Sequence, residues 1–211
     1  MARFEIDVLL EHLHLDASAL VPGERKIFDR VLASLETKRS VARAQLLDAL
    51  RSDRYLKLLD QVELAIQDPK ASMTEGGSLQ DLARKEFKKL RREVRQLSSD
   101  PSDQELHNVR IRTKKARYAA ELAQPTMGKA GSRYIQQTKR LQDVLGDHQD
   151  SIIAENQLRE ILTTTRGVRA AFAMGQVVER LHARRRQARA AFPREWDKLK
   201  RRSRLAFSED T

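Results

Sequence analysis

Apolar residues recur every three or four positions along most of the chain, which is the spacing of an amphipathic helix. Residues 79–97 illustrate this spacing with a stripe formed by Leu79, Ala83, Phe87, Leu90, Val94 and Leu97. Runs that alternate apolar and polar residues, as strands do, are nearly absent, and only 8 Gly and 5 Pro interrupt the 211 residues. The pattern predicts an all-α fold.

In the first third of the chain, the pattern predicts a short helix over residues 4–15 and a long helix over residues 24–67. A straight helix of the second length would measure about 65 Å at about 1.5 Å per residue, so we expect a bend near Ser52 and Asp53. Residues 68–78 contain Pro, Gly and Ser and are expected to form a linker.

After the linker, helices are expected at residues 79–97, 103–125, 133–164, 168–191 and 196–207. Ser102 or Asp103 is the expected N-cap of the second of these helices. Residues 126–132 are expected to form a turn. Pro193 is expected to end the last long helix, and Gly146 to interrupt the helix around it.

Charge is spread unevenly along the chain, whose formal net charge is +11. Residues 1–75 hold 11 basic and 13 acidic residues, whereas residues 76–211 hold 30 basic and 17 acidic residues. Together with the linker, this difference predicts two helical halves with the boundary at residue 75. A positive field of this size favours a polyanionic partner such as nucleic acid, an anionic membrane or a phosphate polymer.

The stretch over residues 106–121, LHNVRIRTKKARYAAE, holds five Lys or Arg and one His. At about 100° per residue, one narrow face, called here the basic stripe, carries His107, Arg110, Lys114, Arg117 and Glu121. An apolar stripe that begins with Leu106 and Val109 lies on one side of it, and Ile111 and Tyr118 lie on the other. The basic stripe is therefore expected to point inward, towards other helices.

Inward cations are costly without a counter-charge, which leaves two interpretations open. Acidic side chains can pair with the stripe, as on an ordinary salt-bridged helix. Alternatively, a bound anion neutralises the cations, and the stripe is the floor of an anion site. His107 is either a helix-start histidine that is hydrogen-bonded inside the bundle, or a donor to the bound anion.

Several classes of site are not indicated by the sequence. The chain has no cysteine, and His12 and His14 point to different helix faces, so no metal site is predicted. His148, beside Asp147 and Asp150, has no accompanying nucleophile or oxyanion motif, and no Gly-rich phosphate loop is present. We therefore predict neither enzymatic activity nor a cofactor.

Two features that the sequence lacks bear on its binding partner and on its location in the cell. Only 10 aromatic residues are present, which argues against single-stranded nucleic-acid recognition by stacking. No run of 18 apolar residues and no secretory signal pattern is found, which predicts a soluble, cytoplasmic protein without a membrane partner.

Four segments resemble a known family. Residues 106–118, LHNVRIRTKKARY, followed by Glu121, resemble the second histidine helix of CHAD domains (conserved histidine α-helical domains), whose pattern is LHxxRIxxKxxRYxxE. Residues 139–150, KRLQDVLGDHQD, resemble the LQxxLGxxxD helix of the same family. Residues 6–10 and 52–59 are similar to its RDLDVLL and SxRYxxLL segments, so the resemblance covers essentially the whole chain.

The resemblance implies two antiparallel helical bundles, a pseudo-two-fold repeat of four-helix-type halves over residues 1–75 and 76–211. It also implies a basic cleft shared by the halves. Family members bind inorganic polyphosphate and can associate with polyphosphate granules, and the fold itself carries no catalytic activity. The expected ligand-binding residues are His107, Arg110, Lys114, Arg117, Tyr118, Lys139, Arg140, Lys88, Arg91, Arg185 and Arg189.

Some of these residues carry alternatives. Either Lys139 or Arg140 is expected to face the cleft, with Asp143 or Asp150 orienting the cations. The arginine run that contains Arg185 and Arg189 either extends the phosphate track or is a solvated helix face. Two other functions also remain open: nonspecific nucleic-acid binding through backbone contacts, and docking of an acidic protein on the basic face.

The chain departs from the family pattern at its start. Family members open with a first histidine helix of the form HxxRVxxRRxR, and this chain begins after that segment, so the first half is expected to be incomplete. Residues 35–44 resemble residues 181–190, as expected for two related halves. A stripe with Val8, Leu9, Ile27, Val31 and Leu35 should then be partly uncovered, which predicts a homodimer or another cover.

Overall fold

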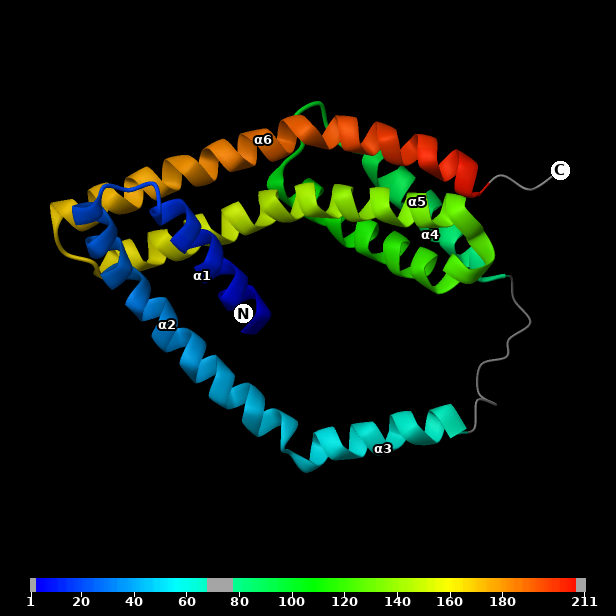
Figure 1. Ribbon diagram of the computed structural model, residues 1–211, viewed down its shortest axis with the longest axis horizontal. Helices are drawn as coiled ribbons and strands as arrows, with labels where there is room; N and C mark the ends of the chain where they lie inside the picture. Colours follow the sequence, from blue (N-terminus) through cyan, green and yellow to red (C-terminus); the bar gives the residue numbers. More distant parts are fainter. Residues whose placement is uncertain (1–2, 68–77, 208–211) are drawn as a thin grey trace. The chain divides into compact units, whose positions relative to one another are not determined.

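The computed structural model describes residues 3–67 and 78–207, and of residues 3–5 it describes the backbone alone. The described residues form helices and no strand (Figure 1), so the predicted all-α fold is confirmed. The helices are α1 (Arg3–Ala17), α2 (Pro22–Leu50), α3 (Asp53–Gln67), α4 (Leu79–Arg95), α5 (Asp103–Thr164) and α6 (Val168–Ala206). Over the described ranges, none of these helices is both long and apolar enough to cross a membrane.

The long helix predicted over residues 24–67 is divided by the bend that its length suggested. Between α2 and α3, the Ser52 hydroxyl donates to the Ala49 carbonyl at 2.6 Å and accepts from the Tyr55 amide at 3.4 Å. The serine thus bonds to the last turn of one helix and to the first turn of the next. The predicted linker at residues 68–78 lies outside the described residues except for Ser78.

Three of the predicted helix breaks are wrong or smaller than expected. The turn expected over residues 126–132 reduces to Gly128, where a φ of 55° and a ψ of −150° interrupt the helix after it has passed through Pro125. Figure 1 shows the chain turning back on itself there. Helix α6 continues through Pro193, and Gly146 lies in unbroken helix.

Burial explains why Pro193 does not end α6. A proline in a helix interior removes one backbone donor and costs about 3 kcal/mol. Phe192 and Trp196 are each 8% exposed, and Leu199 is fully buried. Each such side chain contributes roughly 1.5–3 kcal/mol when it leaves water. Continuing the helix keeps all three in the core, so burial outweighs the local break.

The chain folds into two compact units. The N-terminal unit comprises Met1–Glu75 and Ile153–Leu181, and the C-terminal unit comprises Gly76–Ile152 and His182–Thr211. The segment from 153 to 181 packs with the N-terminal residues rather than with the residues around it, whereas the sequence analysis placed it in the second half. Helices α5 and α6 consequently contribute to both units.

In the N-terminal unit, one apolar core joins α1 and α2 to residues 153–181. Its fully or almost fully buried members include Leu13, Phe28, Leu32, Leu158 and Val177. Of the stripe that was expected to be partly uncovered, Leu9, Val31 and Leu35 are buried in this core, whereas Val8 and Ile27 are half-buried. Sequence reasoning had assigned the covering residues to the other half of the chain.

In the C-terminal unit, Gly128 divides its part of α5 into a first arm, residues 103–127, and a second arm, residues 129–152. A second core lies among these arms, α4 and the end of α6, and it includes Phe87, Leu90, Val109, Tyr134, Leu141 and Leu199. The Phe87 ring meets the Tyr134 ring edge-on at 5.8 Å and lies 6.1 Å from the Trp196 ring.

Side-chain contacts give the order of the helices around this core. Glu93 of α4 pairs with Arg112 of the first arm at 3.5 Å, and Gln137 of the second arm donates to Glu195 of α6 at 2.8 Å. Arg84 closes the ring by donating from α4 to the Phe207 carbonyl, just after α6, at 2.6 Å. With the bond between the arms described below, the unit is a four-helix bundle in the order α4, first arm, second arm, α6.

Candidate functional site

The N-terminus of α5 is fixed by a reciprocal cap. The Ser102 hydroxyl accepts from the Glu105 amide at 3.2 Å, and the Glu105 carboxylate accepts from the Ser102 amide at 2.7 Å and from the Ser98 amide at 3.1 Å. These bonds lower the pKa of Glu105 to about 2. Of the two N-caps predicted, Ser102 is the one used, and it sets the start of the first arm.

Only one of the two apolar stripes predicted on the first arm is buried. Leu106 and Val109 are in the core, but Ile111 is 39% exposed and Tyr118 is 48% exposed. A helix in a four-helix bundle has one core to face, so it buries a single stripe. The basic stripe therefore points only partly inward: His107, Arg110, Lys114 and Arg117 are half-buried at the edge of the core, and Glu121 is exposed.

Three members of the basic stripe, His107, Arg117 and Glu121, have partners within the bundle. His107 Nδ1 lies 3.0 Å from Gln149 Oε1 of the second arm. Arg117 Nε lies 3.5 Å from Glu121 Oε1, and the Arg117 guanidinium stacks over the Tyr118 ring at 4.8 Å from its centroid. These contacts correspond to the interpretation in which His107 is hydrogen-bonded inside the bundle and an acidic side chain pairs with the stripe.

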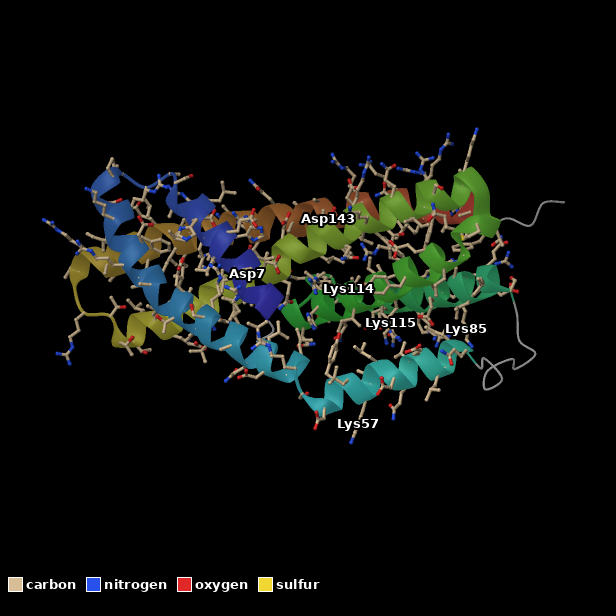
Figure 2. All side chains as sticks on the ribbon, turned by 60° about the horizontal axis from the view of Figure 1, so that its bottom comes forward. Asp7, Lys57, Lys85, Lys114, Lys115 and Asp143 are labelled. Carbon is tan, nitrogen blue, oxygen red and sulfur yellow. The ribbon has the colours of Figure 1, made fainter. Side chains whose placement is uncertain are left out.

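The two central members of the stripe, Arg110 and Lys114, differ from their neighbours. The buried Nε atoms of Arg110 and Arg117 both lack a hydrogen-bond partner in the described part of the chain, but only Arg117 has a carboxylate at ion-pair distance. Lys114 likewise forms no ion pair with any described residue. Figure 2 places Lys114 and Lys115 on the first arm of α5 and Asp143 on the second. The half-buried positive charge of Arg110 and Lys114 is thus left without a carboxylate in the described structure.

The bond between His107 and Gln149 sets the register of the two antiparallel arms. Because both arms are α-helices of the same rise, Arg117 lies at the level of Lys139. Lys139 and Arg140 are both exposed, but Lys139 is on the flank of the second arm that carries Gln149, and Arg140 is 100° further round the helix. We call the line where the two flanks meet the α5 seam.

A second cluster of charged groups surrounds His148, whose ring is 2% exposed. Its Nε2 lies 3.2 Å from Asp103 Oδ1 and 3.3 Å from the Arg189 guanidinium. Burial lowers the pKa of His148 below its ordinary value. Asp103 opposes this shift, and the nearby arginines of α6 add to it. The folded protein therefore favours a neutral imidazole at this position.

The two α6 arginines predicted to bind a ligand lie beside Asp103. Arg189 donates to Asp100 at 2.9 Å, to Asp103 at 3.2 Å and to the Pro101 carbonyl. Arg185 lies 3.9 Å from the other oxygen of the Asp103 carboxylate. Arg189 thus ties α6 to the loop before α5, which is an architectural role that neither sequence interpretation included.

The remaining predicted residues are not gathered with the basic stripe. Lys88 and Arg91 are exposed on α4, on the flank away from Glu93, which pairs with the first arm. Helix α4 contacts the first arm through Arg112, which is on the other flank from the seam. These side chains are free to meet a polyanion, but on a different side of the bundle.

The sequence analysis did not predict the contact of Gln149 with His107, or the contact of His148 with Asp103. The spacing of Lys139, Gln142, Gly146 and Gln149 by three or four residues was a signal for a second polar flank. This polar flank is hard to recognise in the sequence because it carries fewer charged residues than the first arm. Among the described residues, no group of three or more His, Asp or Glu side chains is placed to hold a metal ion.

The profile of the CHAD domain family matches residues 5–159, which is well over half of the chain. The chain belongs to the CHAD domain family. In this CHAD domain the two motifs that suggested the family lie on the two arms of α5. LHNVRIRTKKARY is in the first arm, LQDVLGDHQD is in the second, and the bond from His107 to Gln149 joins them.

Relatives of this CHAD domain include a protein of Mycobacterium tuberculosis. An uncharacterised protein of Mycobacterium tuberculosis, named Rv2226 in one strain and MT2285 in another, is 26% identical over 164 residues. The match covers 73% of this chain and 31% of that protein, so the chain spans about a third of the length of these relatives.

Among solved structures, PptA from Streptomyces chartreusis has the same fold. The TM-score is 0.71 at 23% sequence identity, and the match covers 92% of this chain and 74% of that one. The likeness supports the helical architecture described above.

Proposed function

We propose that this CHAD domain binds inorganic polyphosphate along the basic stripe of α5, as a binding module without catalytic activity. The observation that carries the proposal is the uncompensated charge of Arg110 and Lys114. A half-buried cation without a counter-charge is costly, and a bound anion removes that cost. Membership of the CHAD family supports a phosphate polymer as the anion.

The chemistry of the stripe suits a linear phosphate polymer. Arg110 can fork onto two phosphate oxygens, whereas Lys114 acts as a mobile point charge with three donors. From His107 to Arg117 the stripe runs ten residues, which is about 15 Å along the helix. A polymer with a charge every few ångströms can meet every cation in this length, but a single phosphate can meet only one or two.

The test compares two double variants that remove the same charge. Arg110→Gln with Lys114→Gln alters the centre of the stripe. Arg92→Gln with Lys115→Gln removes one Arg and one Lys from exposed positions that form no ion pair with described residues. Binding of defined-length polyphosphate is measured by calorimetry at fixed salt. We expect the stripe variant to bind at least tenfold more weakly and the control variant to lose less than threefold.

Equal losses in the two variants would mean that only net charge matters, and would overturn the proposed site. The same proteins are titrated with duplex DNA at equal phosphate concentration. If DNA competed as well as long-chain polyphosphate, a nonspecific nucleic-acid-binding protein would be the better description. A discrete acidic protein that stays bound in excess polyphosphate would instead favour an interaction module.

A further inference from the structure

The second arm of α5 carries a polar line that matches the basic stripe level by level. The bond between His107 and Gln149 fixes one level. Since the arms are antiparallel helices with equal rise, each step of three or four residues along one arm is matched by the same step back along the other. The matched levels are His107 with Gln149, Arg110 with Gly146, Lys114 with Gln142, and Arg117 with Lys139.

Gly146 leaves a notch in this line, at the level of Arg110. A Cβ atom added to Gly146 would have no heavy atom within 4 Å beyond its chain neighbours and its own helix backbone. Packing therefore does not require a glycine here, although a glycine is unfavourable in a helix interior. The missing side chain lies between Gln142 and Gln149, which are seven residues or about 10 Å apart along the helix.

Two unsatisfied polar groups lie at this part of the seam. The buried Nε of Arg110 has no hydrogen-bond partner among the described residues, and neither has the buried Oε1 of Gln142. A buried guanidinium donor beside open space, with a glutamine amide one level away, can hold a phosphate group from two sides. The amide can rotate to present its NH2 group.

We infer that the notch at Gly146 seats one phosphate of the polymer and selects a bare phosphoanhydride chain over a nucleic-acid backbone. This inference rests on the proposed function. In polyphosphate, the phosphorus atoms are joined through oxygen and carry no organic substituent. The chain is therefore slender enough to enter a gap the size of one side chain. In a phosphodiester, every phosphate is flanked by sugars, which hold it out of the notch while still allowing contact with exposed cations.

The experiment fills the notch without changing charge. Gly146→Gln continues the glutamine line of the second arm with a residue that favours helix. Gly175→Gln is the matched control, because Gly175 lies inside α6, is exposed and also has no atom within 4 Å of an added Cβ. Each protein is titrated separately with defined-length polyphosphate and with a short DNA duplex, and helix content and melting temperature are recorded.

We expect Gly146→Gln to melt no lower than the natural protein, because a glycine has been removed from a helix. Its affinity for polyphosphate should fall at least tenfold while its affinity for DNA changes less than twofold, and Gly175→Gln should change neither. Gly146→Ala, which adds a single methyl group at the floor of the notch, should weaken polyphosphate binding by less than threefold. If Gly146→Gln does not fold, Gly146→Ser is used instead. Its loss of polyphosphate affinity should lie between the losses expected for Gly146→Ala and Gly146→Gln.

If folded Gly146→Gln bound polyphosphate as well as the natural protein, the inference that the notch seats a phosphate would be overturned, while the proposed function would remain intact. Equal losses for polyphosphate and DNA would also overturn it, because the seam would then be an unselective cationic surface. If the natural protein itself bound no polyphosphate, the proposed function would fail first. The three failures are therefore distinguishable in one set of titrations.

Discussion

The imidazole Nε2 of His148 lies 3.2 Å from the carboxylate of Asp103, and the ring is almost fully buried. The same nitrogen lies 3.3 Å from the Arg189 guanidinium. It can donate to Asp103 only when it carries a proton, and can accept from Arg189 only when it does not. The proton on this nitrogen therefore decides which of the two bonds is formed.

This cluster predicts that the protein loses stability as the pH falls below about 6.5. The folded state lowers the pKa of His148, mainly through burial, whereas the unfolded chain titrates near 6.5. Below that pH the unfolded state binds the additional proton more readily, so the free energy of unfolding decreases until the folded pKa is passed. Melting curves at pH 7.5, 6.5 and 5.5 measure the change.

The control for the pH effect is His148→Gln, a neutral side chain of similar size. Its melting temperature should vary less between pH 7.5 and 5.5 than that of the natural protein. Asp103, Asp100, Arg185 and Arg189 are unchanged in the variant, so their titration is common to both proteins. The same pH dependence in the two proteins would assign the effect to groups other than His148.

Arg189 is predicted to stabilise the fold rather than to bind the ligand. Its guanidinium holds the loop before α5 through Asp100, Asp103 and the Pro101 carbonyl. Arg189→Lys keeps the charge but loses the planar fork. Because hydrogen bonds to charged groups contribute about 1.5–3 kcal/mol each, we expect a loss of about 2 kcal/mol in the free energy of unfolding. Urea denaturation measures this loss.

Polyphosphate affinity of the Arg189→Lys variant should stay within threefold of the natural value, measured at a temperature where the variant is folded. A loss of affinity without a loss of stability would place Arg189 in the ligand site instead, as the sequence suggested.

Binding to polyphosphate is predicted to weaken steeply with salt. Extending counterion-release arithmetic from nucleic acids, five to seven phosphate contacts cost roughly two to three decades of affinity between about 50 and 200 mM salt. Lys114→Gln should lower the slope of log affinity against log salt by about one, since one contact is lost. Titrations at four salt concentrations determine both slopes, and a flat response would contradict an electrostatic site.

The packing of residues 153–181 with the N-terminal unit predicts a large effect at Leu158. This side chain is 1% exposed, in one core with α1 and α2. Leu158→Ala should lower the free energy of unfolding by about 2–5 kcal/mol through lost burial and a cavity. Leu162, four residues further on, is 44% exposed, so Leu162→Ala should cost less than about 1 kcal/mol. Similar losses at both positions would contradict this assignment.

Local patterns predicted the helices well and their breaks less well. The bend at Ser52 follows from chain length and local hydrogen bonding, and the cap at Ser102 from a serine three residues before a glutamate. By contrast, Pro125 and Pro193 do not end their helices. A proline signal is local, whereas the burial of Phe192 and Trp196 that outweighs it depends on residues from other helices.

The sequence by itself determined the helical class, the family motifs and the face shared by His107, Arg110, Lys114 and Arg117. All of these depend on spacings of three and four residues within one segment. Only the tertiary structure decided which of these charges are compensated. The partner of His107 is 42 residues away, and the two aspartates that pair with Arg189 are 86 and 89 residues away. The order of the helices around the core determines such pairings, and with them the uncompensated charge of Arg110 and Lys114 and the notch at Gly146.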